Sequence, residues 1–200
     1  MKKIISIVLA LSVLFAMSVT ASAAEVESNG GSGSTPVYLS STEDGSIGGA
    51  PSATAMSVTV PTALPMAMSQ TGDVTCADSC KIVNNSYGAV RVKSVTITTA
   101  NGWKLTAFGD KSTLAGEKVD SNKLGFAISI GGGAMALTDG SNANSQSLIS
   151  APIAGCYMSG VGNPAANTVA VEYAAIVTPL SNAVTNANIA NVVFVIEWDT

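Results

Sequence analysis

The side chains that could carry catalysis in this chain are carboxylates and cysteines, because its 200 residues include no histidine. A Ser-His-Asp triad is therefore excluded. Asp110, Glu117 and Asp120 lie within one short stretch, and a pair of tuned carboxylates is the machinery of glycosidases. A secreted hydrolase with carboxylate catalysis is thus one alternative. Such sites usually add aromatic residues for sugar stacking, which form only 5% of this chain. We expect a protein that is not an enzyme and needs no cofactor.

The cysteines offer a second kind of chemistry. Cys76 and Cys80 bracket a loop of three residues. If that loop closes a hairpin, the two cysteines come within disulfide distance, so the sequence predicts a structural disulfide between them. The alternative is that either one pairs with Cys156. An odd number leaves at least one thiol free or paired between chains, and three cysteines without histidine make a poor zinc site.

Two polar segments resemble ligand loops at first sight. Asp139-Gly140-Ser141-Asn142-Ala143-Asn144 has oxygen donors at alternate positions, but it lacks the further carboxylates and the distal glutamate of a calcium loop. Gly131-Gly132-Gly133 is followed neither by a helical pattern nor by the Lys-Ser/Thr pair of a phosphate loop. Both segments are predicted to be turns, and no metal site is expected.

The first 23 residues have the pattern of a secretory signal peptide. Lys2 and Lys3 precede an apolar run that extends to about Val19, and Ala21-Ser22-Ala23 supplies the small residues that signal peptidase recognises. We expect cleavage after Ala23 and an extracellular protein. No later segment has the pattern of a membrane span, so the mature chain should be released or held at a surface by non-covalent contacts.

The charge balance argues against nucleic acid as a partner. Removing Lys2 and Lys3 from the 9 basic residues leaves 7 against 13 acidic ones, a net charge of −6. Nucleic-acid phosphates require faces rich in lysine and arginine.

The mature chain divides into a linker and one domain. Residues 24–53 are rich in Gly and Ser, a composition typical of flexible linkers. From residue 54 to 200, short runs of β-forming residues alternate with turn residues, and no run has a sustained helical period. This pattern predicts an all-β fold, an antiparallel β-sandwich of Ig-like or jelly-roll-like type. The expected strands cover residues 56–60, 64–68, 74–76, 81–83, 89–98, 103–107, 124–130, 134–137, 152–157, 169–177 and 192–198.

Two local features sharpen the prediction. Along residues 90–97 the apolar positions shift by one, which predicts either a bulge near Ser94 or a change of the outward face there. Asn101-Gly102 favours a tight turn, so residues 89–98 and 103–107 are predicted to pair as a hairpin. Within the second strand, Trp103 and Leu105 would share one face.

The tripeptide Trp103-Lys104-Leu105, together with the signal peptide and the all-β pattern, resembles the WxL-domain proteins of Gram-positive cell surfaces. The resemblance implies a secreted domain that associates non-covalently with peptidoglycan, with Trp103 and Leu105 as binding residues. The family carries a second Trp-x-Leu near its C-terminus, where this chain has Ile196-Glu197-Trp198-Asp199. From the residues alone, Trp103 is interpreted as an anchor of the core.

Together these features predict a non-enzymatic secreted surface or matrix protein that binds a cell-wall polymer or a partner protein in adhesion, with self-assembly left open. A second alternative is a fibre-forming subunit, of pilin or biofilm-matrix type. In that case the leader at residues 25–53 would add as a strand to the sheet edge of a neighbouring subunit.

Overall fold

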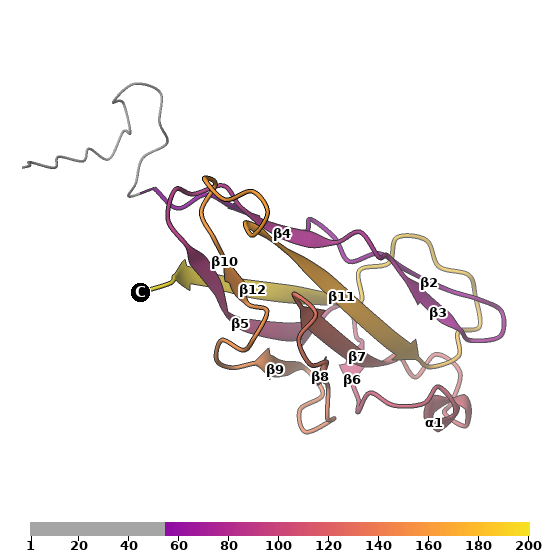
Figure 1. The fold of residues 1–200 in the computed structure, drawn as a ribbon. Coiled ribbons are helices and arrows are strands. Elements are labelled where there is room, and N and C mark those ends of the chain that lie inside the picture. Colours follow the sequence, from indigo (N-terminus) through magenta and orange to yellow (C-terminus); the bar gives the residue numbers. More distant parts are fainter. Residues whose placement is uncertain (1–54) are drawn as a thin grey trace, which may run out of the picture. The chain divides into compact units, whose positions relative to one another are not determined.

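Residues 55–200 are described by a computed structural model, and they form an all-β sandwich (Figure 1). This confirms the predicted fold class. The predicted signal peptide (1–23) and linker (24–53) lie outside the described residues. One helical turn, α1 (Ser112–Ala115), interrupts the β structure. The strands are β1 (Val58–Thr59), β2 (Met66–Met68), β3 (Val74–Cys76), β4 (Lys81–Asn84), β5 (Val90–Thr99), β6 (Lys104–Leu105), β7 (Lys123–Ile130), β8 (Ala136–Leu137), β9 (Ser145–Ile149), β10 (Tyr157–Met158), β11 (Thr168–Val177) and β12 (Ala190–Trp198).

The first sheet has the strand order β1-β4-β11-β7-β6, and β8 also pairs with β7. β11 joins its two halves, because residues 168–170 pair with β4 and residues 171–177 pair with β7. All these pairs are antiparallel except β6 with β7, which is parallel. The sandwich therefore departs from the prediction in one pair. β2 and β3 form a separate antiparallel hairpin.

The second sheet is organised around β5. β12 pairs with β5 over all nine of its residues, while β10 and β9 pair with the opposite edge, near the start and the end of β5. Between β5 and β12 the register shifts so that Ser94 is opposite Val195 and Val92 is opposite Ile196. Lys93 is the extra residue, which confirms the predicted bulge next to Ser94.

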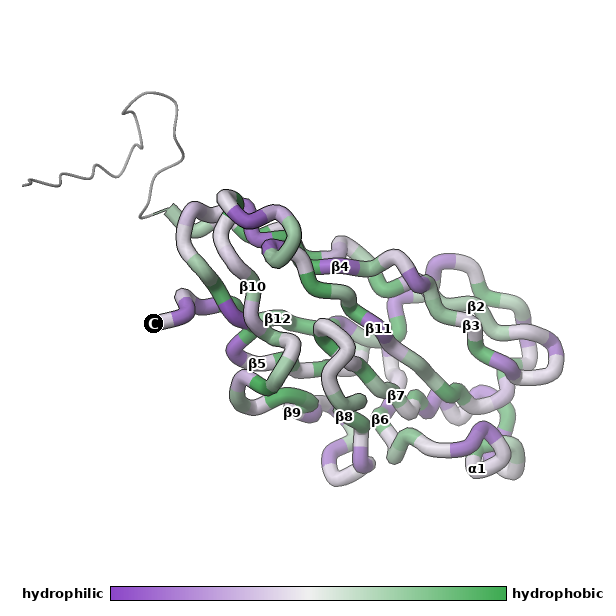
Figure 2. Tube along the Cα trace, viewed as in Figure 1, coloured by the Kyte–Doolittle hydropathy of each residue, from purple (hydrophilic) through white to green (hydrophobic). Residues whose placement is uncertain are grey.

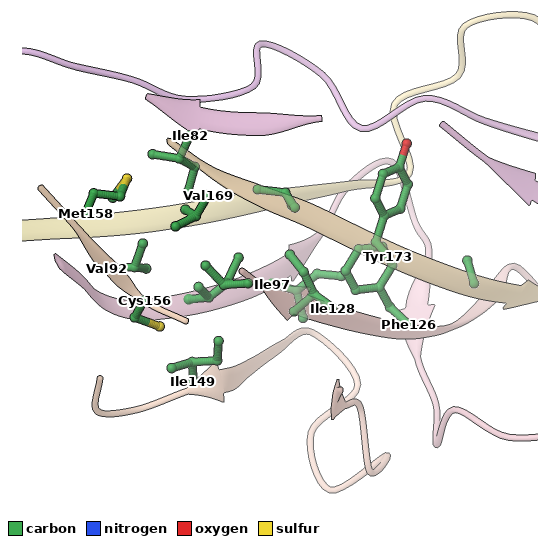
Figure 3. Close-up of a cluster of buried hydrophobic side chains, with 14 of the residues drawn as sticks. Ile82, Val92, Ile97, Phe126, Ile128, Ile149, Cys156, Met158, Val169 and Tyr173 are labelled. Carbon is green, nitrogen blue, oxygen red and sulfur yellow. The ribbon is translucent and has the colours of Figure 1, made fainter. Parts of the chain in front are cut away.

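The core lies between the two sheets. Figure 3 shows side chains from both layers meeting there, with Ile82 and Val169 from the first sheet near Val92 and Met158 from the second. Figure 2 shows apolar residues along the strands and hydrophilic ones mainly in the loops. The fully buried large apolar side chains are Ile82, Val90, Val92, Val95, Ile97, Leu124, Ile128, Ile130, Met158 and Val171.

The continuous apolar run of β7 has a simple packing reason. Its large residues, such as Phe126 and Ile128, enter the core at alternate positions, while small residues occupy the other face. A Cβ atom at Gly125 would lie 2.9 Å from the Ala107 carbonyl oxygen and 2.7 Å from Ile176. The second face is covered so closely that larger residues could not fit there.

The turn at Asn101-Gly102 is confirmed, but the hairpin predicted around it is wrong. Both residues have positive φ (51° and 81°), and the Trp103 N–H donates to the Ala100 carbonyl at 3.1 Å. The chain then leaves β5 and pairs with β7 as β6. The reason is that Thr98 and its neighbours already pair with β12 on one side and β9 on the other. No edge of β5 is left there for a returning strand.

Tyr173 ties the β2–β3 hairpin to the sandwich. Its ring stacks on Phe126 with the centroids 6.0 Å apart, and its hydroxyl points away from the core toward the hairpin (Figure 3). The hydroxyl donates to the Pro65 carbonyl and accepts the Ala77 N–H at 3.2 Å. Burial raises the pKa of Tyr173 to about 12. The phenol therefore stays protonated, and can donate, throughout the physiological range.

We expect Tyr173→Phe to lower the free energy of unfolding by about 1 kcal/mol, because the Pro65 carbonyl and the Ala77 N–H lose the hydroxyl and keep only their 3.2 Å bond to each other, while the ring packing remains. Denaturant unfolding measures this loss, and amide exchange at Ala77 should accelerate selectively. Wild-type stability together with unchanged exchange at Ala77 would contradict the proposed role of the hydroxyl.

Candidate functional site

The structure separates the two residues that the family resemblance implies in binding. Leu105 is paired with Leu124 across β6 and β7 and is only 4% exposed, so it offers no surface to a ligand. Trp103 packs against the core and keeps part of its surface accessible. Its position fits the interpretation as a core anchor. A binding role for Trp103 stays a prediction.

Cys76, Cys80 and Cys156 are all free thiols in the structure. Cys76 and Cys80 do not face each other across a hairpin, because β3 pairs with β2 and β4 pairs with β1 and β11. Both are partly buried, and burial raises the pKa of the Cys76 thiol. Cys156 is fully buried beside Val92 in the core (Figure 3). A thiol with a raised pKa is a poor nucleophile, so the burial of Cys76 disfavours redox chemistry at that residue.

The carboxylates Asp110, Glu117 and Asp120 each have a partner of their own. Asp110 accepts the Ser112 N–H at 2.8 Å, which lowers its pKa. Glu117 forms an ion pair with Lys123 at 2.7 Å. Hydrogen bonds from the hydroxyl and N–H of Ser181 lower the pKa of Asp120. A glycosidase needs one carboxyl whose pKa is raised so that it can act as an acid. Asp110 and Asp120 are shifted in the opposite direction.

Glu197 and Asp199 belong to an ion cluster on the outer face of the second sheet. Glu197 contacts Lys93 at 2.8 Å and Arg91 at 2.9 Å, and Arg91 also reaches Asp199 at 3.3 Å. The hydrogen bond from Lys93, followed by that from Arg91, lowers the pKa of Glu197. The cluster neutralises the one charged side chain of β12.

The segment from Asp139 to Asn144 is a polar turn, as predicted. Asp139 and Asn142 accept N–H groups from residues two positions ahead, at 2.8 and 2.9 Å, so their oxygens are used within the turn. No group of three or more His, Cys, Asp or Glu residues that could hold a metal ion occurs between residues 55 and 200. Gly131 and Gly132 have positive φ in the turn that leads from β7 back to β8, which confirms a turn there as well.

A pocket of about 430 Å³ lies between the tip of the β2–β3 hairpin, α1 and the segment after β11. Its two charged lining residues each have a partner: Lys111 pairs with Asp73, and Asp110 accepts the Ser112 N–H. Asp73 also accepts from the Thr71 hydroxyl at 2.7 Å, and the bonds from Lys111 and Thr71 lower its pKa. The pocket therefore has an apolar wall, formed by Val177, Pro179 and Leu180, and few polar groups left to recognise a ligand.

The most unusual surface is the free edge of β12. Among residues 55–200, no strand pairs with the edge of β12 that faces away from β5. Val193 and Val195 lie on its outer side and are 52% and 43% exposed. On its inner side, Phe194, Ile196 and Trp198 pack against the core but are only partly buried. The central residues on both sides of this strand are therefore apolar and incompletely covered.

The outer strands elsewhere in the two sheets are short. β1, β6, β8 and β10 have two residues each, and β9 has five, of which three are Ser or Gln. Natural sheets protect long edges with lysine, proline or bulges. β12 has nine residues, no lysine or proline, and its register shift lies on β5. Within the described part of the chain, β12 is therefore the long outer strand without these protections.

Sequence reasoning missed this edge. The run Val192-Val193-Phe194-Val195-Ile196 is apolar on both faces, a pattern typical of a central strand. Only the pairing in three dimensions places it outermost.

No family model, curated protein or solved structure matches the chain. None of the helical structure in the described part has the length and apolar character that a membrane-crossing helix requires.

The disulfide between Cys76 and Cys80 stays a prediction without the hairpin first expected to bring the thiols together, and it now rests on the three-residue spacing and on export. If the chain is exported, we expect the secreted protein to carry it. The intact mass should be two hydrogens below that of the reduced form, and thiol reagents should label only Cys156, after unfolding. Because the closed loop is short, replacing both cysteines by serine should cost about 2 kcal/mol or less. Labelling of Cys76 and Cys80 in the native secreted protein would contradict the prediction.

The ion cluster makes a prediction about pH. The pKa of Glu197 lies below its ordinary value of 4.5, so its ion pairs stabilise the fold above that pH and are lost as the pH falls through the lowered pKa. We expect Glu197→Gln to be less stable than wild type at neutral pH, with the difference shrinking at acidic pH and at high salt. A difference in unfolding free energy that stays constant with pH would disprove this role.

Proposed function

We propose that this chain is a non-enzymatic, secreted protein of the cell surface or extracellular matrix that binds a partner protein along the free edge of β12. The observation that carries the proposal is the nine-residue edge that no strand of residues 55–200 pairs with, with Val193 and Val195 exposed beside it. Export is inferred from the signal pattern in residues 1–23.

The mode of binding follows from the chemistry of a sheet edge. An unpaired strand presents a row of N–H and C=O groups that an extended segment of another chain can complete. The main-chain bonds supply affinity, and alternate side chains supply selectivity. Val193 and Val195 favour β-branched or aromatic residues opposite them, since such pairs stabilise by about 0.2–1 kcal/mol each.

A cell-wall polymer is the second candidate ligand, and it rests on the resemblance carried by Trp103. The accessible part of Trp103 is the observation that favours it. A third candidate function is that of a fibre-forming subunit, because the same free edge could accept residues 25–53 of a neighbouring subunit. In all three proposals the carboxylates stabilise the fold, and the protein performs no catalysis.

A photo-reactive residue placed at Val195, in the cells that secrete the protein, tests the proposal. We expect adducts with a polypeptide, because a strand added to β12 would lie against this position. Val119, which is 54% exposed, is the matched control and should give none. Adducts at Val195 that become soluble only when peptidoglycan hydrolases digest the wall would favour the wall polymer. Equal yields at Val119 and Val195, or none at either, would refute a role for the edge.

A further inference from the structure

We propose that the partner at this edge is a second copy of the same chain. The two β12 strands would pair antiparallel about a two-fold axis that passes through Phe194. This inference rests on the proposed role of the β12 edge and names its occupant.

The register follows from the length of the strand. β12 runs from Ala190 to Trp198, so Phe194 is its midpoint. Centring the axis there pairs all nine residues of each copy, Ala190 with Trp198 of the other copy and so on inward. A shift by two residues in either direction leaves two residues of each strand unpaired. The full pairing therefore completes the largest number of main-chain hydrogen bonds.

The same register matches the side chains. Val193 lies opposite Val195 of the second copy, and Val195 lies opposite Val193, so two apolar pairs form on the exposed outer side. Because paired positions differ by an even number, inward-facing residues also meet inward-facing ones. Val192 is then opposite Ile196, which covers apolar surface that each copy alone leaves partly accessible.

Charge does not oppose this pairing. Glu197 is the one charged residue of β12, and in this register it lies opposite Asn191 of the second copy, whose amide can donate to it. Its charge is also balanced by Lys93 and Arg91 on the neighbouring strand. A shift by two residues that centres the axis on Val195 would instead place Glu197 opposite Val193.

The arrangement closes on itself. The described residues of each copy offer one long unprotected edge, and the two-fold axis uses both edges, so the expected product is a dimer rather than an open fibre. The two second sheets would become one continuous sheet. An interface of a single strand pair is small, so we expect a dissociation constant of about micromolar order.

Charge substitutions on the chain from residue 24 onward test the register by analytical ultracentrifugation. Val193→Lys alone and Val195→Glu alone should each weaken the homodimer roughly tenfold or more. In either homodimer, both copies place the introduced charge opposite a valine of the other copy. Mixing the two variants should restore a heterodimer, since the introduced lysine of one then faces the introduced glutamate of the other. The double variant V193K/V195E should dimerise with itself. Thr96→Lys is the control: Thr96 lies on the outer face of the same sheet, but on β5 and not on the β12 edge, so this variant should leave the dimer intact.

Several outcomes would overturn the inference. These are a monomeric wild type, a dimer indifferent to all the charge variants, or single variants that are not rescued by mixing. Polymers that vanish when residues 24–53 are removed would make the leader the occupant instead. A monomeric wild type that still gives polypeptide adducts at Val195 would leave the proposed function standing with a different partner. Absence of both dimer and adducts would remove both proposals.

Discussion

The occupation of both edges of β5 determines how the rest of the chain can be arranged. β12 takes one edge along its whole length, and β9 and β10 take parts of the other. Its inner face, from Val90 to Ile97, is sealed against the first sheet. A strand that follows Thr99 finds no free edge of β5 to pair with, so the chain turns at Asn101-Gly102 and crosses to β7. This crossing buries Leu105 and seats Trp103 against the core. The same pairing leaves β12 with one unfilled edge.

Local sequence patterns predicted the long strands well and their partners poorly. The bounds of β5, β7, β11 and β12 were predicted to within two residues, because alternation or a continuous apolar run is a local signal. The bulge beside Ser94 and the turn at Asn101-Gly102 are local in the same sense. β9 was missed, since its first three residues are polar and its strand character comes only from pairing with β5. Pairing partners depend on which edges remain free, and no short segment encodes that.

The candidate site was hidden for a different reason. A search for reactive residue types finds the carboxylates and cysteines, and the structure gives those carboxylates structural neighbours, such as Ser112 for Asp110 and Lys123 for Glu117. The surface proposed for binding consists of main-chain groups flanked by valines. Such a surface contains no distinctive side chain, so composition and motif spacing carry little information about it.

The chemistry of β12 also bears on why an open edge is tolerated. A single inward or edge charge usually repels an incoming strand. Glu197 could serve in that way, yet Lys93 and Arg91 hold it on the outer face, where its charge is compensated. The centre of the strand, from Val192 to Ile196, carries no other deterrent. Elsewhere the sheets limit their edges by keeping the outer strands short. This contrast within residues 55–200 is the reason for proposing a partner at this edge, because an edge without a use would be expected to carry the same protection as the others.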